Sequence, residues 1–570
     1  MVNENENDND NFQAAHGGVI DRINYQLSIP AGQQLSIVNY QFSIEYKFSI
    51  VMASNLYSSL LIGGAAVLSL TGCGGEAKKA VPRSADPRPN VIFILADDLG
   101  YGDLPCYGAD SLDTPLINAL AAGGIRFTNA HCVASTSTPA RYGLLTGAYP
   151  FRKPGTNVAA GNAGMIIRPE QYTVADVFHD AGYATAAIGK WHLGLGDRTG
   201  EQNWNDTLDL TPRDLGFDYH YIMAATADRV PCVFIEQGRV ANYDASAPIT
   251  VSYRGPIGDE PLGSTHPELL TKLRPSHGHD MAIVNGISRI GYMTGGGEAL
   301  WQDENIADSI TAHAVEFMSS HRDEPFFLYL CTNDIHVPRY PHDRFRGKSP
   351  MGLRGDAILQ FEWTVEQIVG ALNDFDLADN TLIVLTSDNG PVLDDGYDDQ
   401  AVALAGSHRP GGPFRGGKYS AFEAGNAIPF IVSGAGVEGP AVSNALVSQI
   451  DALATFAQLV GVTVPDGQAP DSRSALSTWL GHDTAHRPFA LSMAANRSLE
   501  VRTARWKYIE PSDGEPVITW GPVIETGYSL QPQLYDLSTD SGETDNVASS
   551  HPAQVDSLST LLDSIRQSAK

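Results

Sequence analysis

The sequence has 570 residues, of which 42% are apolar and 18% are charged. This length suffices for one large domain and a smaller appendage, and the composition excludes a coiled coil or a disordered chain. The formal net charge of −29 argues against nucleic acid as a partner, because binding phosphate requires clustered Lys and Arg.

We interpret the first 89 residues as a targeting sequence. Residues 1–51 are interpreted as an over-extended N-terminus, 52–72 as a lipoprotein signal peptide and 73–89 as a tether. Leu70-Thr71-Gly72-Cys73 resembles the bacterial lipobox. We therefore expect an exported protein, periplasmic or in the outer membrane, that is anchored through a lipid on Cys73. A membrane-spanning helix or a buried core helix remains the alternative for the apolar run.

Four further cysteines stand at positions 106, 132, 232 and 331, with no CxxC pair and no zinc-binding spacing. Oxidation outside the cytoplasm would permit disulfides, but the spacing assigns none. We expect ordinary burial of the thiols instead.

From residue 90 onward, predicted strands alternate with predicted helices. The first strand, at 90–97, is a continuous apolar run typical of a central parallel strand. A helix within 114–127 has Thr114 as its expected cap and a glycine stop. Further helices are expected at 174–183, 308–322, 356–372 and 445–459, and further strands at 184–189, 325–331, 381–387 and 429–433.

This alternation predicts an α/β fold, with a large doubly wound mixed sheet flanked by helices. Residues 90–484 would form this catalytic domain. From about residue 485 the pattern changes to short alternating strands at 499–510 and 533–546, followed by a helix at 554–567. We expect residues 485–570 to form a small antiparallel β subdomain with one helix.

Oxygen-bearing side chains follow two of the predicted strands. Asp97 and Asp98 end the first strand, and Asp388 and Asn389 end the strand at 381–387. In a doubly wound sheet the carboxyl ends of strands collect at one edge, so these groups could meet. Three carboxylates and an amide suit Ca²⁺, or less well Mg²⁺, far better than zinc.

The segment Cys132-VASTSTPARYGLLTG contains Ser137-Thr138-Pro139-Ala140-Arg141. It resembles the signature of type I sulfatases of the alkaline phosphatase superfamily, in which a Cys or Ser at the first position of C/SxPxR is oxidised to formylglycine. The resemblance implies a bacterial enzyme of the Ser type, with Ser137 as the converted residue and as a further metal ligand. Cys132 has neither Pro nor Arg at the required offset.

Three further segments resemble elements of the same family, in the same order. They are Gly189-Lys190-Trp191-His192-Leu193-Gly194, Asp334-Ile335-His336-Val337-Pro338 and Arg415-Gly416-Gly417-Lys418. The resemblance implies catalytic roles for Arg141, Lys190, His192, His336 and Lys418. It suggests His192 as the base and His336 as the acid, or the reverse division of these two roles.

The chemistry of sulfate ester cleavage accounts for such a set. The site must stabilise negative charge on the sulfuryl oxygens, supply a nucleophile and protonate the leaving oxygen. An aldehyde hydrate offers one hydroxyl for attack on sulfur and a second whose deprotonation releases sulfate, whereas a plain serine would stay sulfated. Local cations would also resolve the conflict between an anionic substrate and an acidic protein.

The resemblance implies a sulfated glycan as substrate, with galactose or N-acetylgalactosamine sulfate as the best estimate, and a radical-SAM maturing enzyme as a partner. Four segments between the motifs could form the sugar pocket: 224–232, 276–280, 392–400 and 407–412. Within them, Arg229, His408 and Arg409 are the expected substrate contacts.

Two other functions are consistent with parts of this pattern. One is a phosphate or phosphonate ester hydrolase of the same superfamily, which would use unmodified Ser137 and a dinuclear metal site. The other is a non-catalytic glycan-binding lipoprotein, which would lack some of the motif residues.

Overall fold

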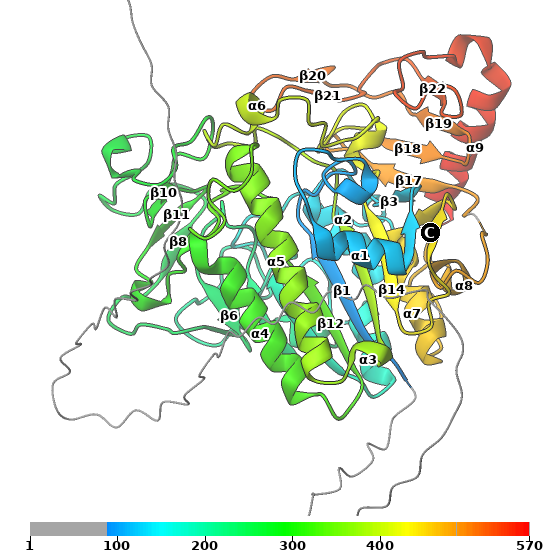
Figure 1. The fold of residues 1–570 in the computed structure, drawn as a ribbon. Coiled ribbons are helices and arrows are strands. Elements are labelled where there is room, and N and C mark those ends of the chain that lie inside the picture. The colour runs from blue at the N-terminus through cyan, green and yellow to red at the C-terminus, as the bar shows by residue number, and fades with distance from the viewer. Residues whose placement is uncertain (1–87, 486, 569–570) are drawn as a thin grey trace, which may run out of the picture. The chain divides into compact units, whose positions relative to one another are not determined.

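A mixed sheet of ten strands forms the centre of the fold in the computed structural model (Figure 1), which describes residues 88–485 and 487–568. Its strands, in spatial order, are β15 (Ala441–Ser443), β2 (Ile125–Phe127), β14 (Phe430–Gly434), β13 (Thr381–Ser387), β1 (Asn90–Ala96), β12 (Phe326–Cys331), β4 (Ala184–Lys190), β5 (Tyr219–Met223), β6 (Phe234–Glu236) and β7 (Arg239–Val240). The predictions for residues 1–51, for 52–72 including the lipobox, and for all but the end of the 73–89 tether fall outside the described residues.

The five strands from β13 to β5 run parallel, and β14 and β6 pair antiparallel at either side of them. Every residue of β1, β12 and β13 is buried. Continuous apolar runs of this kind are expected where helices cover both faces of a parallel sheet. The predicted mixed sheet and its central strands are therefore confirmed.

Two neighbouring phenylalanines in β12 show that helices cover both faces. Phe326 contacts Phe317 of α4 (Ile306–Ser320), with ring centroids 5.8 Å apart. Phe327 stacks on Phe178 of α3 (Val174–Asp180) at 4.1 Å. Because successive side chains of a strand point to opposite faces, α3 and α4 lie on opposite sides of the sheet.

Each layer contains further helices. The α4 layer includes α1 (Pro115–Gly123) and α5 (Gly352–Asp374), which lie in front of the sheet in Figure 1. The α3 layer includes α2 (Ser137–Thr146) and α7 (Ala452–Val460). Two short helices, α6 (Ala401–Leu404) and α8 (Leu476–Trp479), complete this part of the chain.

A second, antiparallel sheet follows, with β17 (Ala490–Met493), β18 (Leu499–Arg502), β19 (Trp506–Ile509) and β22 (Gln533–Asp536), and then α9 (Pro552–Gln567). Four two-residue or three-residue pairs complete the strands: β3 (Ala130–His131) with β16 (Val447–Ser448), β8 (Thr250–Ser252) with β11 (Tyr292–Thr294), β9 (Ile283–Val284) with β10 (Ile287–Ser288), and β20 (Val517–Ile518) with β21 (Ile524–Glu525). The predicted small antiparallel sheet and terminal helix are confirmed.

Two local predictions were wrong. The helix expected at 445–459 begins only at Ala452, because Val447–Ser448 pairs with β3 and the next three residues form a 3-10 turn. Thr114 occupies the N-cap position of α1, but its side chain makes no capping hydrogen bond. Glu362 of α5 instead accepts hydrogen bonds from the backbone nitrogens of Leu116 and Ile117.

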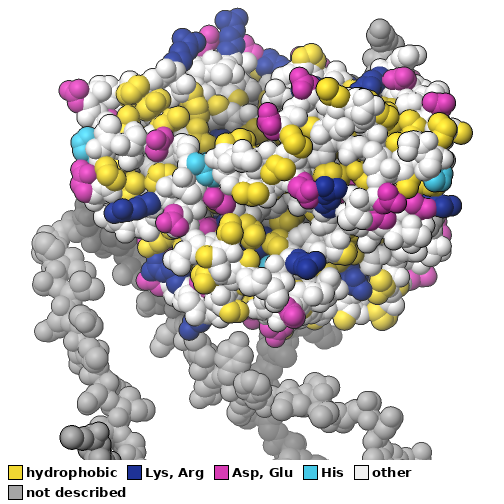
Figure 2. Space-filling view, turned by 90° about the horizontal axis from the view of Figure 1, so that it is seen from above, with side chains coloured by type: hydrophobic (Ala, Val, Ile, Leu, Met, Phe, Trp, Pro, Cys, Tyr) yellow, Lys and Arg dark blue, Asp and Glu magenta, His cyan; other side chains and the backbone are white. Residues whose placement is uncertain are grey.

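The cysteines at 106, 132, 232 and 331 are free thiols, and all but the partly buried Cys106 are buried, as expected. In the described part of the chain, no helix combines the length and hydropathy of a membrane span. On the face shown in Figure 2, Lys and Arg side chains lie among the Asp and Glu side chains, with apolar side chains between them.

Candidate active site

Polar side chains gather where four neighbouring parallel strands end. Asp97 and Asp98 follow β1, Asp388 follows β13, Lys190 ends β4, and His336 lies five residues after β12. All five side chains are buried. Since the order of these strands is β13, β1, β12, β4, residues far apart in the sequence meet at one edge of the sheet.

Ser137 is the first residue of α2, whose ten residues are all buried. Its hydroxyl donates to Asn389 Oδ1 at 3.2 Å and accepts from Lys190 Nζ at 2.9 Å. The free backbone N–H groups at a helix N-terminus favour negative charge. The start of α2 thus offers an anion both a hydroxyl-bearing side chain and a positive electrostatic environment.

Arg141, one turn into α2, joins this helix to two strand ends. Its Nε donates to Asp388 Oδ2 at 2.9 Å, and its Nη1 donates to the Lys190 carbonyl at 3.0 Å. Burial by itself would raise the pKa of Asp388, but Arg141 and the two lysines of the site hold it below its usual range. Arg141 is therefore placed to fix Ser137 relative to Asp388 and Lys190.

Two lysines pair with the carboxylates at the end of β1. Lys190 Nζ lies 2.6 Å from Asp97 Oδ1, and Lys418 Nζ lies 2.8 Å from Asp98 Oδ2. Lys418 also lies 2.8 Å from Asp395, which accepts a further hydrogen bond from the Tyr419 hydroxyl.

The cluster consists of four buried carboxylates and three buried cations, which leaves a net charge of minus one. Its acids are Asp97, Asp98, Asp388 and Asp395, and its bases are Arg141, Lys190 and Lys418. A dication would reverse the sign of this charge, and a sulfate monoester, with one negative charge, would then neutralise it. The charge count favours a bound cation when an anionic substrate is present.

The donor set also fits a cation. Ligand atoms of Asp97, Asp98 and His336 lie within 4.8 Å of one another. Asp97 Oδ2 is buried without a hydrogen-bond partner, although buried carboxylate oxygens are normally paired. Burial raises the pKa of Asp97 although Lys190 opposes it, so its ionised form requires additional positive charge. Oxygen ligands of this kind bind hard divalent cations.

His192 and His336 lie at the same cavity. The Thr138 hydroxyl of α2 donates to the His192 carbonyl at 3.0 Å, and His192 adopts a left-handed backbone with φ of 59°. Strain of this kind in a residue other than glycine is concentrated at functional sites. Burial, with Lys190, Arg229 and Arg141 nearby, lowers the pKa of His192 well below its usual value, so the imidazole is neutral.

Glycine is required directly before Lys190. Gly189 has φ of +99°, and a Cβ there would lie 1.8 Å from the carbonyl oxygen of Cys331 in β12. The close approach of β4 and β12 brings Lys190 and the segment that carries His336 to the same place.

These groups line a cavity of about 460 Å³. Ser137, His192, His336 and Lys418 belong to its wall, and so do Asp228, Arg229, His277, His279, Asp395, Tyr419 and Trp520. Arg229 Nη1 lies 2.8 Å from Asp228 Oδ2, and His279 Nε2 lies 3.0 Å from the same oxygen. The cavity therefore combines anion-binding groups with polar groups suited to hydroxyls.

The residues predicted as substrate contacts do not all meet here. Arg229 lines the cavity. His408 does not, because its buried Nε2 pairs with Asp103 at 2.8 Å, and Arg409 is exposed outside the lining residues. Three of the four predicted sugar-pocket segments contribute residues, whereas 407–412 contributes none.

Sequence reasoning did not single out several lining residues. Asp228, His279 and Asp395 fall within segments that were selected, and Tyr419 directly follows Lys418, so proximity to a motif could have found them. Trp520 lies in a segment without any motif. No sequence signal connects it to the site.

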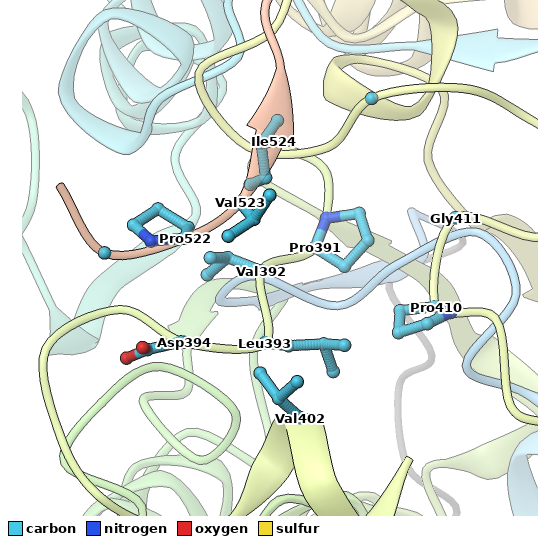
Figure 3. A pocket seen from close by; sticks show the side chains of 12 residues that line it. Pro391, Val392, Leu393, Asp394, Val402, Pro410, Gly411, Pro522, Val523 and Ile524 are labelled. Atoms are coloured by element: carbon cyan, nitrogen blue, oxygen red, sulfur yellow. The ribbon is translucent and has the colours of Figure 1, made fainter. Parts of the chain in front are cut away.

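A second cavity, of about 440 Å³, is shown in Figure 3. Its lining residues Asp394 and Gly521 directly adjoin Asp395 and Trp520 of the first cavity, so the two are neighbours. The wall of the second cavity is mostly apolar, including Val392, Leu393, Val402 and Val523, and Asp394 is its one charged lining residue. It lacks the cations that an anionic ester requires. The chemistry of the site is therefore confined to the first cavity.

Comparisons with known proteins agree with this geometry. A family model described as Sulfatase matches residues 89–462. An N-acetylgalactosamine-6-O-sulfatase of Bacteroides thetaiotaomicron is 50% identical over 497 residues, 87% of this chain and 96% of that protein. Arylsulfatase A of Homo sapiens is 29% identical over 501 residues, 83% of this chain and 87% of that protein.

A solved structure from work on the metabolism of multiple glycosaminoglycans by Bacteroides thetaiotaomicron has a TM-score of 0.83 and 50% identity. The alignment covers 85% of this chain and 100% of that one.

Proposed function

The chain belongs to the sulfatase family and is a sulfuric ester hydrolase, and from this premise we propose that it removes the 6-O-sulfate of N-acetylgalactosamine units in sulfated glycans. The choice of N-acetylgalactosamine 6-sulfate as substrate rests on the 50% identity to an N-acetylgalactosamine-6-O-sulfatase, across 96% of that protein. Neither the phosphate ester hydrolase nor the non-catalytic binding protein has support from the comparisons.

The proposed catalytic roles follow from the contacts of each side chain. Ser137, oxidised to formylglycine by a radical-SAM maturing enzyme, would supply as its hydrate the attacking hydroxyl and the hydroxyl whose deprotonation releases sulfate. Arg141 orients residue 137 through its hydrogen bonds to Asp388 and the Lys190 backbone. Lys190 and Lys418 provide positive charge for the sulfuryl oxygens.

The two histidines transfer the protons. Neutral His192, whose Nδ1 is buried without a partner, can accept a proton from residue 137. His336 Nδ1 lies 2.7 Å from the Val337 carbonyl, so Nδ1 carries one proton. As the imidazolium, His336 carries a second proton on Nε2, which lies 3.9 Å from Asp98 Oδ2 and can pass to the leaving oxygen. Leaving-group protonation therefore falls to His336.

The residues that would hold the cation are Asp97, Asp98, Asp388 and Asn389, with residue 137 beside them. When bound, Ca²⁺ would offset the charge of the sulfate group. Stepwise addition of Ca²⁺ or Mg²⁺ to chelator-treated protein should raise the thermal midpoint, and Ca²⁺ should do so at the lower concentration. Equal midpoints with and without both ions would contradict this assignment.

For the sugar itself, we assign Asp228, Arg229 and His279 to hydroxyl and amide recognition, because they form one hydrogen-bonded group in the cavity wall. The cavity encloses such a group beside the nucleophile, as sites for small polar ligands do.

The test of function is a panel of sulfated sugars offered to protein produced together with a maturing enzyme. We expect sulfate release from N-acetylgalactosamine 6-sulfate and little from its 4-sulfate. Faster release from the 4-sulfate would refute the proposed specificity.

Mass spectrometry of peptide 127–141 is the test of maturation, because formylglycine is lighter than serine by two hydrogen atoms.

We also propose that the protein is exported and anchored through Cys73, on the basis of the apolar run at 52–72 and the lipobox-like sequence at 70–73, with which that run ends. In a bacterial host, the wild-type protein should fractionate with membranes and incorporate labelled fatty acid. Cys73→Ala should lose both properties, and retention of the label would contradict the anchor.

A further inference from the structure

One wall of the catalytic cavity is formed by the tip of a hairpin that the mechanism does not use. β20 (Val517–Ile518) pairs antiparallel with β21 (Ile524–Glu525), and residues 519–523 connect them. Trp520 lines the catalytic cavity, whereas Gly521, Pro522 and Val523 line the neighbouring apolar cavity. The hairpin tip therefore stands between the two cavities, with Pro522 and Val523 visible in Figure 3.

The base of the hairpin is fixed to the segment that carries Lys418. Arg415 Nε donates to Glu525 Oε2 at 2.8 Å, and the Ser420 hydroxyl donates to the Glu525 carbonyl at 2.7 Å. Ala421 N donates to the Thr526 carbonyl at 2.8 Å. These bonds join the base of the hairpin to the segment that carries Lys418.

The indole is positioned by two neighbouring rings. Its ring centroid lies 5.4 Å from that of His277 and 5.8 Å from that of Tyr419, and both contacts are edge-to-face. A Cβ on Gly521 would lie 2.0 Å from the His277 ring, so the tip is seated closely against this histidine. Trp520 nevertheless remains 58% exposed.

An exposed indole at the mouth of a polar cavity suits a particular ligand chemistry. A pyranose ring has an apolar face of C–H groups and a rim of hydroxyls, and aromatic side chains combine a broad apolar surface with a polar edge. Polar groups flank the indole here as well. Ser276 Oγ donates to Asp394 Oδ1 at 2.8 Å, and His277 Nδ1 lies 3.7 Å from the same oxygen.

We propose that Trp520 is the platform for the sugar linked to the sulfated residue, so that the enzyme recognises at least two sugars of a glycan rather than a monosaccharide. This inference rests on the proposed function. The sulfated sugar occupies the cavity at Ser137, and its neighbour packs on the indole, with Asp394 and His277 in reach of its hydroxyls. Burial of the apolar face of that second ring on the exposed indole supplies the added affinity and outweighs the cost of ordering the ring.

The experiment compares Trp520→Ala with wild type on two substrates: N-acetylgalactosamine 6-sulfate and a disaccharide in which the same residue is linked to a hexuronic acid. We expect Trp520→Ala to lower kcat/KM for the disaccharide about tenfold, by raising KM, and to leave the monosaccharide within about twofold. Trp520→Phe should retain most of the activity on the disaccharide.

Tyr243→Ala provides the matched control, because Tyr243 is an exposed aromatic residue, 39% accessible, that lines neither cavity. It should change neither rate. An equal effect of Trp520→Ala on both substrates, or no effect on either, would overturn the inference. Unchanged far-UV circular dichroism of Trp520→Ala excludes misfolding as the cause.

Failure of the proposed function would be visible separately, as wild-type protein that cleaves neither 6-sulfated substrate. The role of Trp520 is then tested with whichever sulfated sugar of the panel the wild-type protein does cleave. That sugar is offered both alone and linked to a second sugar. A loss confined to the linked form would still support it, and an equal effect on both forms would still overturn it.

Discussion

At the scale of single residues, Ser137 and Ser135 lie two positions apart in one buried segment but differ in their hydrogen bonds. Ser137 is bonded to Lys190 and Asn389, whereas the Ser135 hydroxyl has no partner. We expect Ser137→Ala to reduce kcat more than about a thousandfold, because the nucleophile is lost. Ser135→Ala should retain activity within about twofold, and both variants should unfold at the wild-type denaturant concentration. Sulfate release and chemical denaturation measure these outcomes.

Asp395 provides a second test, because Lys418 lies between it and Asp98. Burial alone would lower the pKa of Lys418, but Asp395 and Asp98 raise it well above its usual value. Asp395→Asn should let Lys418 move toward Asp98 and lower kcat/KM about tenfold to a hundredfold. Asp398→Asn, an exposed change in the same loop, should have little effect. Equal kinetics of the two variants would show that Asp395 does not position the lysine.

The residues found from the sequence differ physically from those that were missed. Ser137, Lys190 and Asp388 stand in fixed spacings with Pro, Gly or Asn, because strand ends and a helix start require those neighbours. Trp520 is positioned by a hairpin tip and by contacts with two rings, those of His277 and Tyr419, from distant segments. His408 was wrongly predicted as a substrate contact. Its true partner, Asp103, is 305 positions away, and the sequence gives no sign that the two pair.

At the scale of elements, buried parallel strands were the most predictable. β13 has the predicted bounds and β1 is shorter by one residue, because an unbroken apolar run fits a strand covered on both faces. The segment at 445–459 failed because apolar composition alone does not separate a helix from a short strand followed by a helix. The pairing of β16 with β3 determines the outcome, and it depends on tertiary contact.

The antiparallel sheet is joined to the segment after Lys418 by a buried charge network. Lys507 of β19 lies 2.7 Å from Glu500 of β18, 3.2 Å from Glu423 and 3.4 Å from Glu543. Arg502 supplies the only other cation near Glu423, at 3.1 Å, among the ion pairs of the described residues. Three buried carboxylates thus share two cations, which favours protonation of the carboxylates that these cations do not neutralise.

This network predicts a pH dependence of stability. Burial raises the pKa of Glu500 to about 8 and that of Glu543 to about 7, although Lys507 opposes both shifts. The folded protein therefore holds these protons more tightly than the unfolded chain, whose glutamates titrate near 4.5. The resulting stabilisation is complete below about pH 4.5 and is lost as the pH rises through about 7 to 8.

We expect the thermal midpoint of the wild type to fall between about pH 5 and about pH 8, and to fall less in Glu500→Gln, which cannot ionise. Glu510→Gln on the adjacent outer position, where Arg566 pairs with Glu510, serves as the control and should keep the wild-type slope. Parallel curves for wild type and Glu500→Gln would show that Glu500 titrates at its ordinary pKa. Differential scanning calorimetry across this pH range is the measurement.

At the scale of the whole molecule, the net charge of −29 opposes the approach of a polyanionic substrate, although individual cationic side chains in the site can contact the ester once it is bound. Long-range repulsion is screened by salt, whereas buried contacts are screened little. We expect kcat/KM for a long sulfated oligosaccharide to rise severalfold between about 10 and about 150 mM ionic strength, and that for the monosaccharide to rise less. A fall with salt would mean that local cations dominate the encounter. Steady-state kinetics at several salt concentrations distinguishes the two.

The placement of the site across β13, β1, β12 and β4 limits how activity can be lost. Its carboxylates, lysines and histidines come from positions between 97 and 418, and those at 97, 98, 190, 336 and 388 meet only when the four innermost strands pair correctly. A partly folded chain, in which these strands are not all paired, should therefore be inactive. Catalysis should vanish at the same denaturant concentration as the central sheet, which makes turnover a faithful reporter of cooperative folding.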